Sequence, residues 1–562
     1  MHRRKAFRIA GMVVAAALVV GNLAGVAAAD VTMTNGFVVS FDNVKIRYTL
    51  FTPASDVPVP VAFYSHGWGG SRATSADDAT VKMFLDRGYA VLTWDARGFG
   101  ESGGEANVDS QEFEVRDVRA LIDLVAGVEG IALDAEGDPR MGMYGGSYAG
   151  GIQLETAAAD SRVDAIAPQI AWNDLTQALK PNGVIKLGWD LVLVGGGAVG
   201  SATGGIAGQE TGVYAGQLYQ VTAESLALND WTSGTYSWFD ARSPKHYIEG
   251  ATLVDGTVLP GINVPALVIQ GTSDTLFNLN QGIANFRTIR DRVGADKTKM
   301  IWYCGGHTLA PLGSSCVPGS ASDLIAGRVA DWFDRWVKED ESVDTGPAFE
   351  YQLQDGTFAS AQDLPSEEVG RVEAQTRVTH AIAPTSGQGT AGTPAGCRPK
   401  TEKDSTQSYA RDCPAVTADW LPIGTMTGPE PKKCGDPPKP LCLPTFEYLK
   451  PGVRIVGAPR VSIRLTGTSP EAYVFFKLID YDTVAKTSVV IDDQVTALKA
   501  LWLNLSTPQI FDLDLAAVSW EVKEGHQQFL EIAPNSNDHA VSRVPGSVTV
   551  DVVASIPGIP AA

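Results

Sequence analysis

The sequence predicts an α/β domain with a parallel sheet and an inserted helical segment, followed by an all-β domain. Apolar runs typical of buried strands alternate with helical patterns between residues 58 and 338, except for an interruption at 172–250. After residue 343, short β-branched and aromatic runs are separated by turn residues, and no long helical pattern follows. The length of 562 residues and the 44% hydrophobic content suit a globular chain.

The first 29 residues have the pattern of a signal peptide. Basic residues precede an apolar run over residues 9–20, and three alanines at 27–29 form a small-residue cleavage site. An uncleaved membrane anchor is disfavoured because the run is shorter than the about 20 residues that a membrane-spanning helix needs. The pair Arg3-Arg4 occurs in twin-arginine signals, but the residues after it match that pattern poorly. We therefore expect an exported protein, secreted or held in the cell envelope, without stable membrane insertion after cleavage.

The α/β domain is expected over residues 30–343. It begins with a hairpin over residues 37–50. Strands that alternate with helices form βαβ units, and the strands of such units are parallel. Buried strands are predicted at 58–64, 89–94, 140–144, 264–270 and 299–303, and helices at 113–128, 280–293 and 323–338.

Residues 172–250 break this alternation. They contain four tryptophans and a glycine-rich apolar stretch over 191–208. We interpret them as an inserted, mostly helical cap over a site, because an apolar insertion of this size needs something to cover. The alternative is an enlarged surface excursion with a small core of its own.

The second domain is expected over residues 344–562 as a β sandwich. Strands are predicted at 349–353, 453–465, 471–479 and 548–554. A stretch rich in proline, glycine and threonine at about 383–445 interrupts the domain and carries four cysteines. We interpret this stretch as a long insert stapled by disulfides.

The six cysteines of an exported chain are free to form disulfides. Proximity favours a bridge between Cys304 and Cys316, and the pairing of the other four stays open. Their spacing lacks the C-x-x-C pairs of zinc sites, and no histidine lies among them. We therefore expect no metal site and no cofactor. The four remaining cysteines are Cys397, Cys413, Cys434 and Cys442.

One serine lies on a glycine-rich turn between a predicted strand and a predicted helix. Residues 140–144 form the strand, residues 152–159 form the helix, and Ser147 lies between them. This order is the nucleophile elbow of a serine hydrolase. The serine of an elbow has a strained backbone, so we expect Gly145 and Gly150 to make room where strand and helix cross. The common signature has glycine two residues after the serine, where this chain has Ala149.

Asp274 and His307 complete the candidate catalytic residues. Each of the three follows a predicted parallel strand, at the sheet edge where open α/β sheets place their sites. The order Ser147, Asp274, His307 is that of α/β-hydrolases, and His307 alone among the seven histidines follows both partners within the first domain. His307 would take the serine proton during attack, and Asp274 would orient the imidazole and stabilise its charged form.

Asp95 is the rival acid. It lies earlier in the chain than the serine, which is the wrong order for the catalytic acid. We expect it instead to organise the surrounding loops by pairing with Arg97.

An oxyanion hole needs two preorganised donors beside the serine. The backbone N–H of Tyr148, just after the nucleophile, is the first candidate. The second is the backbone N–H of Trp68, on the glycine-rich loop that follows the strand at 58–64. The hydroxyl of Tyr64 is a weaker candidate, and the alternative for the Trp68 loop is a simple tight turn.

The whole mature chain resembles the cocaine esterase / X-Pro dipeptidyl-peptidase family, also called the CocE/NonD hydrolases. The resemblance implies an α/β-hydrolase core, a helical cap, a C-terminal jelly roll and hydrolysis of esters or amides by Ser147, Asp274 and His307. The cysteine-bearing insert departs from the family pattern, and the residues after His526 follow it loosely. The matching segments are the elbow at 145–150, the loop at 95–103, residues 172–175 and 242–244 of the insertion, and residues 446–464 and 524–526 of the all-β domain.

These observations predict a secreted serine hydrolase that cleaves carboxylic esters, with amides as further substrates. An X-Pro dipeptidyl-peptidase is the first alternative, but it needs a carboxylate for the substrate amino group. Four acidic residues of the insertion are candidates for it: Glu210, Glu224, Asp230 and Asp240. The second and third alternatives are an acyltransferase and a non-catalytic surface-binding protein. We expect a small ester or peptide as partner and no nucleic acid, because the net charge is −20; the sequence does not indicate an oligomeric state.

Overall fold

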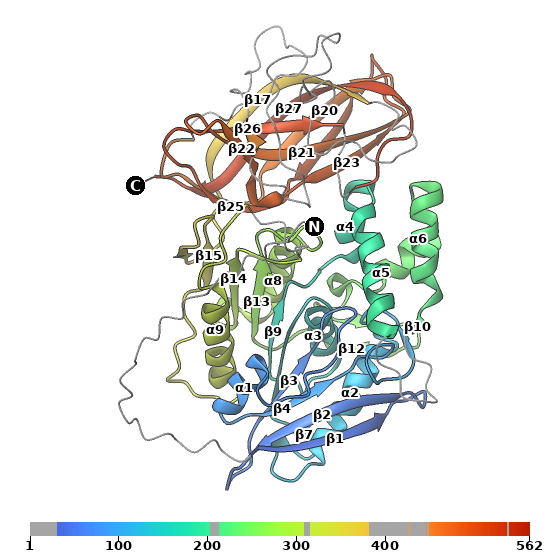
Figure 1. Ribbon diagram of the computed structural model, residues 1–562, viewed down its shortest axis with the longest axis vertical. Helices are drawn as coiled ribbons and strands as arrows, with labels where there is room; N and C mark the ends of the chain where they lie inside the picture. Colours follow the sequence, from blue (N-terminus) through green and yellow to red (C-terminus); the bar gives the residue numbers. More distant parts are fainter. Residues whose placement is uncertain are drawn as a thin grey trace, which may run out of the picture.

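A computed structural model describes residues 31–202, 213–307, 315–380, 426, 427, 446 and 449–561, with gaps at 535 and 537–538. The predicted signal peptide lies outside these residues, and so do the four cysteines of the insert. In Figure 1 the β sheets of the C-terminal part lie above the α/β domain, with helices α4, α5 and α6 along one side. None of the helices in the described part of the chain combines the length and the apolar character that crossing a bilayer requires.

The α/β domain is built on a sheet of ten strands, counted over the described residues. All neighbours from β4 to β15 pair in parallel, and β1, β2 and β16 pair antiparallel at the two edges. The predicted parallel α/β core is therefore confirmed. In sheet order the strands are β1 (Val31–Val39), β2 (Lys45–Pro53), β4 (Ala90–Trp94), β3 (Val61–Ser65), β8 (Met141–Gly146), β9 (Ala165–Gln169), β13 (Ala266–Gly271), β14 (Thr298–Tyr303), β15 (Phe349–Gln352) and β16 (Phe358–Ala361).

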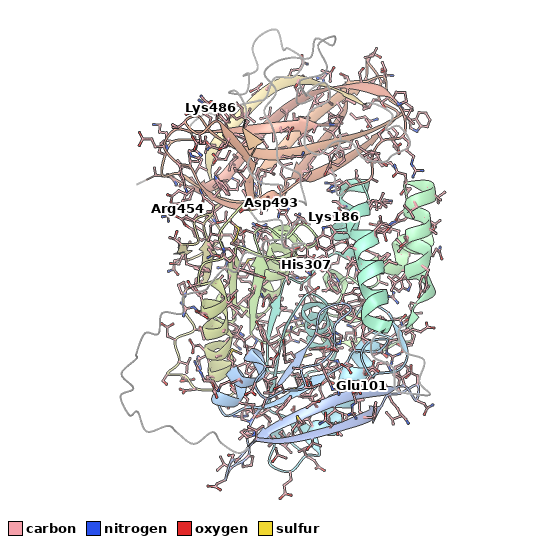
Figure 2. All side chains as sticks on the ribbon, in the orientation of Figure 1. Glu101, Lys186, His307, Arg454, Lys486 and Asp493 are labelled. Atoms are coloured by element: carbon pink, nitrogen blue, oxygen red, sulfur yellow. A yellow bond between two sulfur atoms is a disulfide. The ribbon has the colours of Figure 1, made fainter. Side chains whose placement is uncertain are left out.

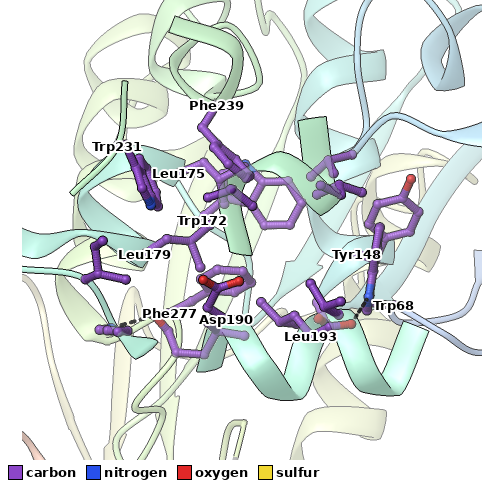
Figure 3. A pocket seen from close by; sticks show the side chains of 18 residues that line it. Trp68, Tyr148, Trp172, Leu175, Leu179, Asp190, Leu193, Trp231, Phe239 and Phe277 are labelled. Carbon is purple, nitrogen blue, oxygen red and sulfur yellow. Dashed lines mark hydrogen bonds between the residues drawn. The ribbon is translucent and has the colours of Figure 1, made fainter. Parts of the chain in front are cut away.

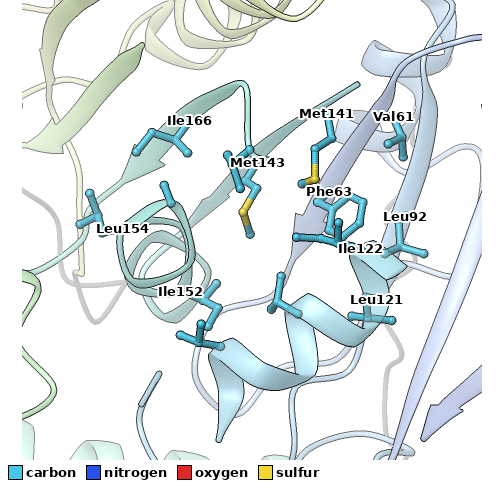
Figure 4. Packing of buried hydrophobic residues seen from close by; sticks show 14 of the residues in the cluster. Val61, Phe63, Leu92, Leu121, Ile122, Met141, Met143, Ile152, Leu154 and Ile166 are labelled. Carbon is cyan, nitrogen blue, oxygen red and sulfur yellow. The ribbon is translucent and has the colours of Figure 1, made fainter. Parts of the chain in front are cut away.

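Helices cover both faces of this sheet because its strands are apolar on both faces. Phe63 of β3 belongs to one buried cluster with Ile122 of α2 and Ile152 of α3 (Figure 4). Its neighbour Ala62 points to the opposite face and joins the cluster that contains Phe84 of α1 and α9 residues. The helices are α1 (Ala79–Asp86), α2 (Glu114–Ala126), α3 (Tyr148–Ala159), α8 (Leu279–Val293) and α9 (Ala321–Trp336).

Strands β15 and β16 extend the sheet past residue 343, where the sequence pattern placed the end of the α/β domain. The pattern assigned residues 349–353 to the all-β domain, but Phe349 pairs in parallel with Met300 of β14. Phe349 also packs edge-to-face on Trp302, with 4.8 Å between ring centroids. The strand pattern alone cannot distinguish the two sheets, and this aromatic packing explains why the strand joins the first one.

The described part of the insertion contains four α-helices that pack between the α/β domain and the β sheets. One buried cluster joins Trp172 and Trp231 of the insertion to Phe277 of the α/β domain and Phe475 of the C-terminal part. The insertion is therefore bound on two sides rather than projecting into solvent. Its helices are α4 (Leu175–Leu179), α5 (Leu187–Ala202), α6 (Gly216–Leu228) and α7 (Ser233–Asp240).

The C-terminal part, as far as the structure describes it, forms two antiparallel sheets with a shared apolar core, as predicted for an all-β domain. Ile463 and Val550 from the first sheet and Phe476 and Leu530 from the second belong to one buried cluster. The first sheet contains β24 (Gln509–Asp514), β20 (Arg460–Gly467), β27 (Gly546–Ile559), β19 (Arg454–Gly457), β25 (Val518–Glu521) and β17 (Glu367–His380). The second contains β18 (Met426–Thr427), β22 (Thr487–Val490), β21 (Glu471–Asp482), β23 (Thr496–Leu501) and β26 (His526–Ala533).

Three carboxyl groups are buried around the first turns of α3. The backbone N–H groups of Asn107 and Ser110 donate to Glu114, and the Gln111 amide donates to Glu155 over 2.6 Å. Asp109 is the third member and is 1% exposed. Burial raises the pKa of Glu114 to about 7 and the pKa of Glu155 to about 8. These groups therefore keep protons in the folded chain at pH values where the unfolded chain has lost them.

We predict that replacing Glu155 makes stability less dependent on pH. As the pH rises from the ordinary pKa of a glutamate to about 8, folded Glu155 keeps a proton that the unfolded chain releases. The free energy of unfolding therefore falls through this range, by up to about 1.4 kcal/mol per pH unit for one group. Calorimetry at pH 5 and pH 8 should show that Tm falls less between these two pH values in Glu155→Gln than in wild type. The exposed Glu129→Gln should behave like wild type, and equal losses in all three proteins would contradict the prediction.

Candidate active site

Ser147 lies at the sharp turn between β8 and α3 with φ 61° and ψ −120°, a strained conformation for a residue other than glycine. A Cβ atom on Gly150 would lie 2.6 Å from the carbonyl oxygen of Gln169. A Cβ atom on Gly145 would lie 2.6 Å from the Cβ of Ala149. The two glycines therefore make the room that the sequence pattern predicted. Ala149 is accepted two residues after the serine because Gly145, which faces it, has no side chain.

The structure brings Ser147, Asp274 and His307 together through two short hydrogen bonds. His307 Nε2 lies 2.7 Å from Ser147 Oγ, and His307 Nδ1 lies 2.7 Å from Asp274 Oδ2. The other carboxylate oxygen of Asp274 accepts the N–H groups of Leu276 and Phe277, at 3.0 and 2.7 Å. Because Asp274 can only accept when ionised, His307 donates from Nδ1, and its Nε2 is left to accept the serine proton.

Asp274 lies on the loop after β13, and His307 lies on the loop after the neighbouring strand β14. These two segments, the acid loop and the histidine loop, pack directly against each other. A Cβ atom on Gly306 would lie 2.3 Å from the Cβ of Asp274, so the two loops touch directly beside the histidine. A disulfide joins Cys304 and Cys316, as proximity favoured, and brackets the histidine loop. The rings of Phe277 and Trp189 stand edge-on to the His307 imidazole, with centroids 5.0 and 6.1 Å away. These contacts leave the imidazole little freedom to turn.

The two residues expected to supply the oxyanion donors lie next to Ser147 or on a loop beside it. Tyr148 is the first residue of α3, so its N–H has no carbonyl partner within the helix. A Cβ atom on Gly67 would lie 3.7 Å from the Cβ of Ser147, which brings the Trp68 loop next to the serine. The Trp68 indole packs edge-on against Tyr148 and donates to the carbonyl of Leu193 over 2.9 Å. The loop is thus tied to both the elbow and the insertion.

Tyr64 is turned away from the serine. Its ring stacks on Tyr144, with centroids 6.2 Å apart, and its hydroxyl bonds to Thr80 of α1. This hydroxyl therefore does not serve as an oxyanion donor in this arrangement.

The predicted pairing of Asp95 with Arg97 is wrong. Asp95 instead accepts the backbone N–H and the guanidinium of Arg72, at 2.7 and 2.5 Å. Arg97 turns toward α2, where its guanidinium donates two hydrogen bonds of 2.6 Å to the two oxygens of Asp117. The forked guanidinium matches this carboxylate better than a single contact within its own loop would. Asp95 nevertheless organises loops and does not contact His307.

An apolar pocket opens beside Ser147 and Tyr148 (Figure 3). Aromatic and aliphatic side chains from the insertion and from the acid loop form most of its wall. These include Trp172, Leu175, Leu218, Trp231, Phe239 and Phe277. The insertion therefore covers the candidate site, and the pocket it makes suits an uncharged group.

Two polar side chains of this pocket were missed in the sequence. Lys186 donates through Nζ to the carbonyls of Thr275 and Leu276, at 2.7 and 2.9 Å. Asp190 of α5 receives a 2.8 Å bond from Thr222 at Oδ1, while its buried Oδ2 accepts no hydrogen bond from the described residues. Figure 3 shows the Asp190 carboxylate directed into the pocket. A lone acid within the apolar run of 187–197 was the signal that could have found it.

Three of the four acidic residues that the sequence offered for binding an amino group are engaged elsewhere. Glu224 accepts bonds from Gln220 and from Thr232, at 2.7 and 2.9 Å. Asp230 pairs with Lys180 and Lys499, and Asp240 pairs with Lys245 and His246. Glu210 lies outside the described residues.

We predict that Gly150→Ala destabilises the fold because the new methyl group meets the Gln169 carbonyl. That carbonyl also accepts the N–H of Ser147 over 2.9 Å, so neither side of the crossing can move freely. Overpacking of this kind costs about 1–3 kcal/mol of unfolding free energy, which denaturant titration measures. Gly195→Ala on α5 is the matched control, because its Cβ meets nothing within 4 Å. A loss in Gly150→Ala no larger than in the control would contradict the prediction.

The family model for the X-Pro dipeptidyl-peptidase (S15 family) matches residues 42–308. Among curated proteins, the quorum-quenching protein AidA of Acinetobacter baumannii (strain MDR-ZJ06) is 33% identical over 159 residues, which cover 26% of this chain and 49% of that protein. An uncharacterized 31.7 kDa protein of the Escherichia coli traX-finO intergenic region is 31% identical over 129 residues, which cover 23% of this chain and 43% of that protein. The chain thus spans about half, or less, of the length of these curated relatives.

Solved structures share the fold over nearly the whole chain. An α-amino acid ester hydrolase has a TM-score of 0.63 at 12% identity, covering 96% of this chain and 98% of its own. An aminopeptidase from a marine sediment Thaumarchaeota archaeon has a TM-score of 0.64 at 13% identity, covering 95% and 97%. A CocE/NonD family hydrolase from Staphylococcus aureus has a TM-score of 0.58 at 14% identity, covering 94% and 93%. The resemblance to the cocaine esterase / X-Pro dipeptidyl-peptidase family that the sequence indicated is confirmed by the family model over residues 42–308, and the solved structures show the shared fold.

Proposed function

We propose that this protein is a serine hydrolase that cleaves carboxylic esters through an acyl-enzyme. The observation that carries the proposal is the hydrogen-bonded chain from Asp274 through His307 to Ser147, beside an apolar pocket. The match to a hydrolase family model over the same residues supports it. The same residues can also cleave amides. We rank esters first because an ester substrate needs no carboxylate in the pocket to bind a free amino group.

In the proposed reaction, Ser147 Oγ attacks the substrate carbonyl carbon while His307 Nε2 takes the hydroxyl proton. Asp274 holds the imidazole through Nδ1 and stabilises its positive charge. The carbonyl oxygen becomes an oxyanion, which the N–H groups of Tyr148 and Trp68 would stabilise. His307 then returns the proton to the leaving alkoxide, and the bond to that oxygen breaks. A water molecule repeats the sequence on the acyl-enzyme, releases the acid and restores Ser147.

We also propose that the protein is exported through its N-terminal signal peptide. The basic, apolar and small-residue regions of residues 1–29 have the required order. The disulfide between Cys304 and Cys316 is compatible with an oxidising compartment.

A fluorophosphonate probe tests the proposed function, because it labels only an activated serine. We predict labelling of wild type and none of Ser147→Ala. Asp274→Asn and His307→Ala should remain folded but lose about 10²- to 10⁴-fold in kcat with p-nitrophenyl butyrate, since each leaves the serine without an oriented base. Unlabelled wild type, or labelling that persists in Ser147→Ala, would exclude an enzymatic role for this site and favour surface binding. Added alcohol acceptors that divert the acyl group into new esters would identify an acyltransferase.

A second function, hydrolysis of substrates with a free amino group, is favoured by Asp190. Asp190 lines an apolar pocket that also reaches Ser147, and its buried Oδ2 accepts no hydrogen bond from the described residues. Burial raises the pKa of Asp190, and an ammonium group bound there would offset the cost of ionising it. Two similar structures bear the names α-amino acid ester hydrolase and aminopeptidase, which describe such chemistry in those proteins. This function would include the release of X-Pro dipeptides from the amino terminus of peptides.

Comparing p-nitrophenyl butyrate with Gly-Pro-p-nitroanilide separates the two functions. We expect the ester to be the better substrate of wild type, and turnover of the anilide alone would reverse this ranking. If Asp190 binds the amino group, Asp190→Asn should lower kcat/KM for the anilide about 10-fold or more, because a charged hydrogen bond is worth about 1.5–3 kcal/mol. The butyrate ester has no amino group and serves as the internal control. Equal losses for both substrates would assign Asp190 to folding of the pocket.

A further inference from the structure

The β domain reaches the acid loop through one buried glutamine. Gln494 follows the turn η4 (Ile491–Asp493), which leads from β22 to β23. Its side-chain amide donates two hydrogen bonds, to the carbonyl of Thr272 over 2.8 Å and to the carbonyl of Asp274 over 3.1 Å. The glutamine is 5% exposed, so water does not replace these bonds easily. A residue 220 positions beyond Asp274 in the chain thus holds the backbone on both sides of Ser273.

The same turn also contacts the end of the histidine loop. Asp493 Oδ2 accepts the backbone N–H of Ser315 over 3.1 Å. Ser315 precedes Cys316, which the disulfide joins to Cys304, three residues before His307. In the view of Figure 2, Asp493 lies at the boundary between the β sheets above and the α/β domain that holds His307 below. Gln494 and Asp493 therefore touch the loops of both Asp274 and His307.

The turn itself has an unusual backbone. Asp492 and Asp493 have φ angles of 51° and 58°. Residues other than glycine adopt such positive φ angles only at a cost in free energy. The backbone N–H of Ser519 bonds to Asp492 Oδ2 over 2.6 Å and secures this shape. A plain connection between two strands does not need such a conformation. The conformation of this turn directs both Asp493 and Gln494 toward the α/β domain.

The acid loop has no free space in which to adjust if these bonds are lost. A Cβ atom on Gly271 would lie 2.2 Å from the carbonyl oxygen of Gly305, and Gly306 packs as closely on Asp274. Any displacement of the Asp274 backbone therefore acts on the histidine loop as well. A shift of about 1 Å in catalytic groups is enough to lower a rate about 100-fold.

We infer that Gln494 is a positioning residue for the proposed triad, so that the β domain forms part of the scaffold of the active site. This inference rests on the proposed function, because it gives Gln494 a role only if Asp274 and His307 act on Ser147. Gln494 does not line the pocket and is not expected to touch substrate.

Gln354 provides a matched control for the test. It follows β15 of the α/β domain, is 7% exposed, and exchanges two side-chain hydrogen bonds of 2.7 and 2.9 Å with the backbone of Glu521 in the β domain. Gln494→Met and Gln354→Met each keep the side-chain volume and each remove a buried amide that bridges the same two domains. If each glutamine only helps to hold the two domains together, the two substitutions should change kcat and Tm by similar amounts.

We expect Gln494→Met to lower kcat for p-nitrophenyl butyrate about 10- to 100-fold with KM within about two-fold, as loss of alignment predicts. Gln354→Met should keep kcat within about three-fold at a comparable loss of Tm. The rate of fluorophosphonate labelling, which requires an activated serine but not hydrolysis of an acyl-enzyme, should fall with kcat in the first variant only. Equal changes in both variants, or a change confined to KM, would overturn the inference while leaving the proposed function intact.

Gln494→Glu is the second variant should the methionine protein not fold. It keeps the length of the side chain but replaces the donating amide with a carboxylate that faces two carbonyls. The same selective loss of kcat is expected, and unchanged kcat in this folded variant would overturn the inference. Absence of labelling in wild type would instead remove the proposed function on which the inference rests.

Discussion

The strained conformation of Ser147 is the constraint on which the site depends. A residue other than glycine in such a sparsely populated conformation costs about 1–3 kcal/mol, so the surroundings must hold it. The Ser147 N–H bonds to Gln169 of β9, and the N–H groups of Gly150 and Gly151 bond to the Ser147 carbonyl. The small residues at the crossing follow from this arrangement, because any larger side chain would separate the helix from the strands that fix the serine.

The same constraint explains the polar residues buried in α3. The helix is buried on nearly all sides, so it cannot place its polar residues toward solvent. Gln153 uses its amide to donate to the carbonyls of Gly145 and Ala149, which secures the turn from beneath. Glu155 lies two residues further along the helix and keeps a proton because of burial. Polar groups at these positions therefore support the elbow and its helix rather than act on substrate.

The elbow turn and the meeting of Ser147, Asp274 and His307 were predictable because each residue follows a strand whose apolar run is visible locally. The contacts that depend on long-range packing were not. Asp95 and Arg97 are two residues apart and suggested a pair, yet each has a better partner on another segment, Arg72 and Asp117. Phe349 resembled a strand of the β domain because a strand pattern does not record which sheet it joins. Asp190 carried a weak local signal, an acid in an apolar run, and only folding showed that it faces the pocket.

The acid loop is where the three structural units of the chain meet. Parallel strands support their loops only at the base, so the loop after β13 extends beyond the hydrogen bonds of the sheet. Lys186, just before the insertion helix α5, bonds to two carbonyls of this loop, and Gln494 of the β domain bonds to two others. Buried carbonyls without donors would cost about 1–3 kcal/mol each, so the loop needs these side chains. The insertion and the β domain therefore fix the acid in place from two sides, and the insertion also lines the pocket. These contacts tie the architecture of the whole chain to the geometry around Asp274.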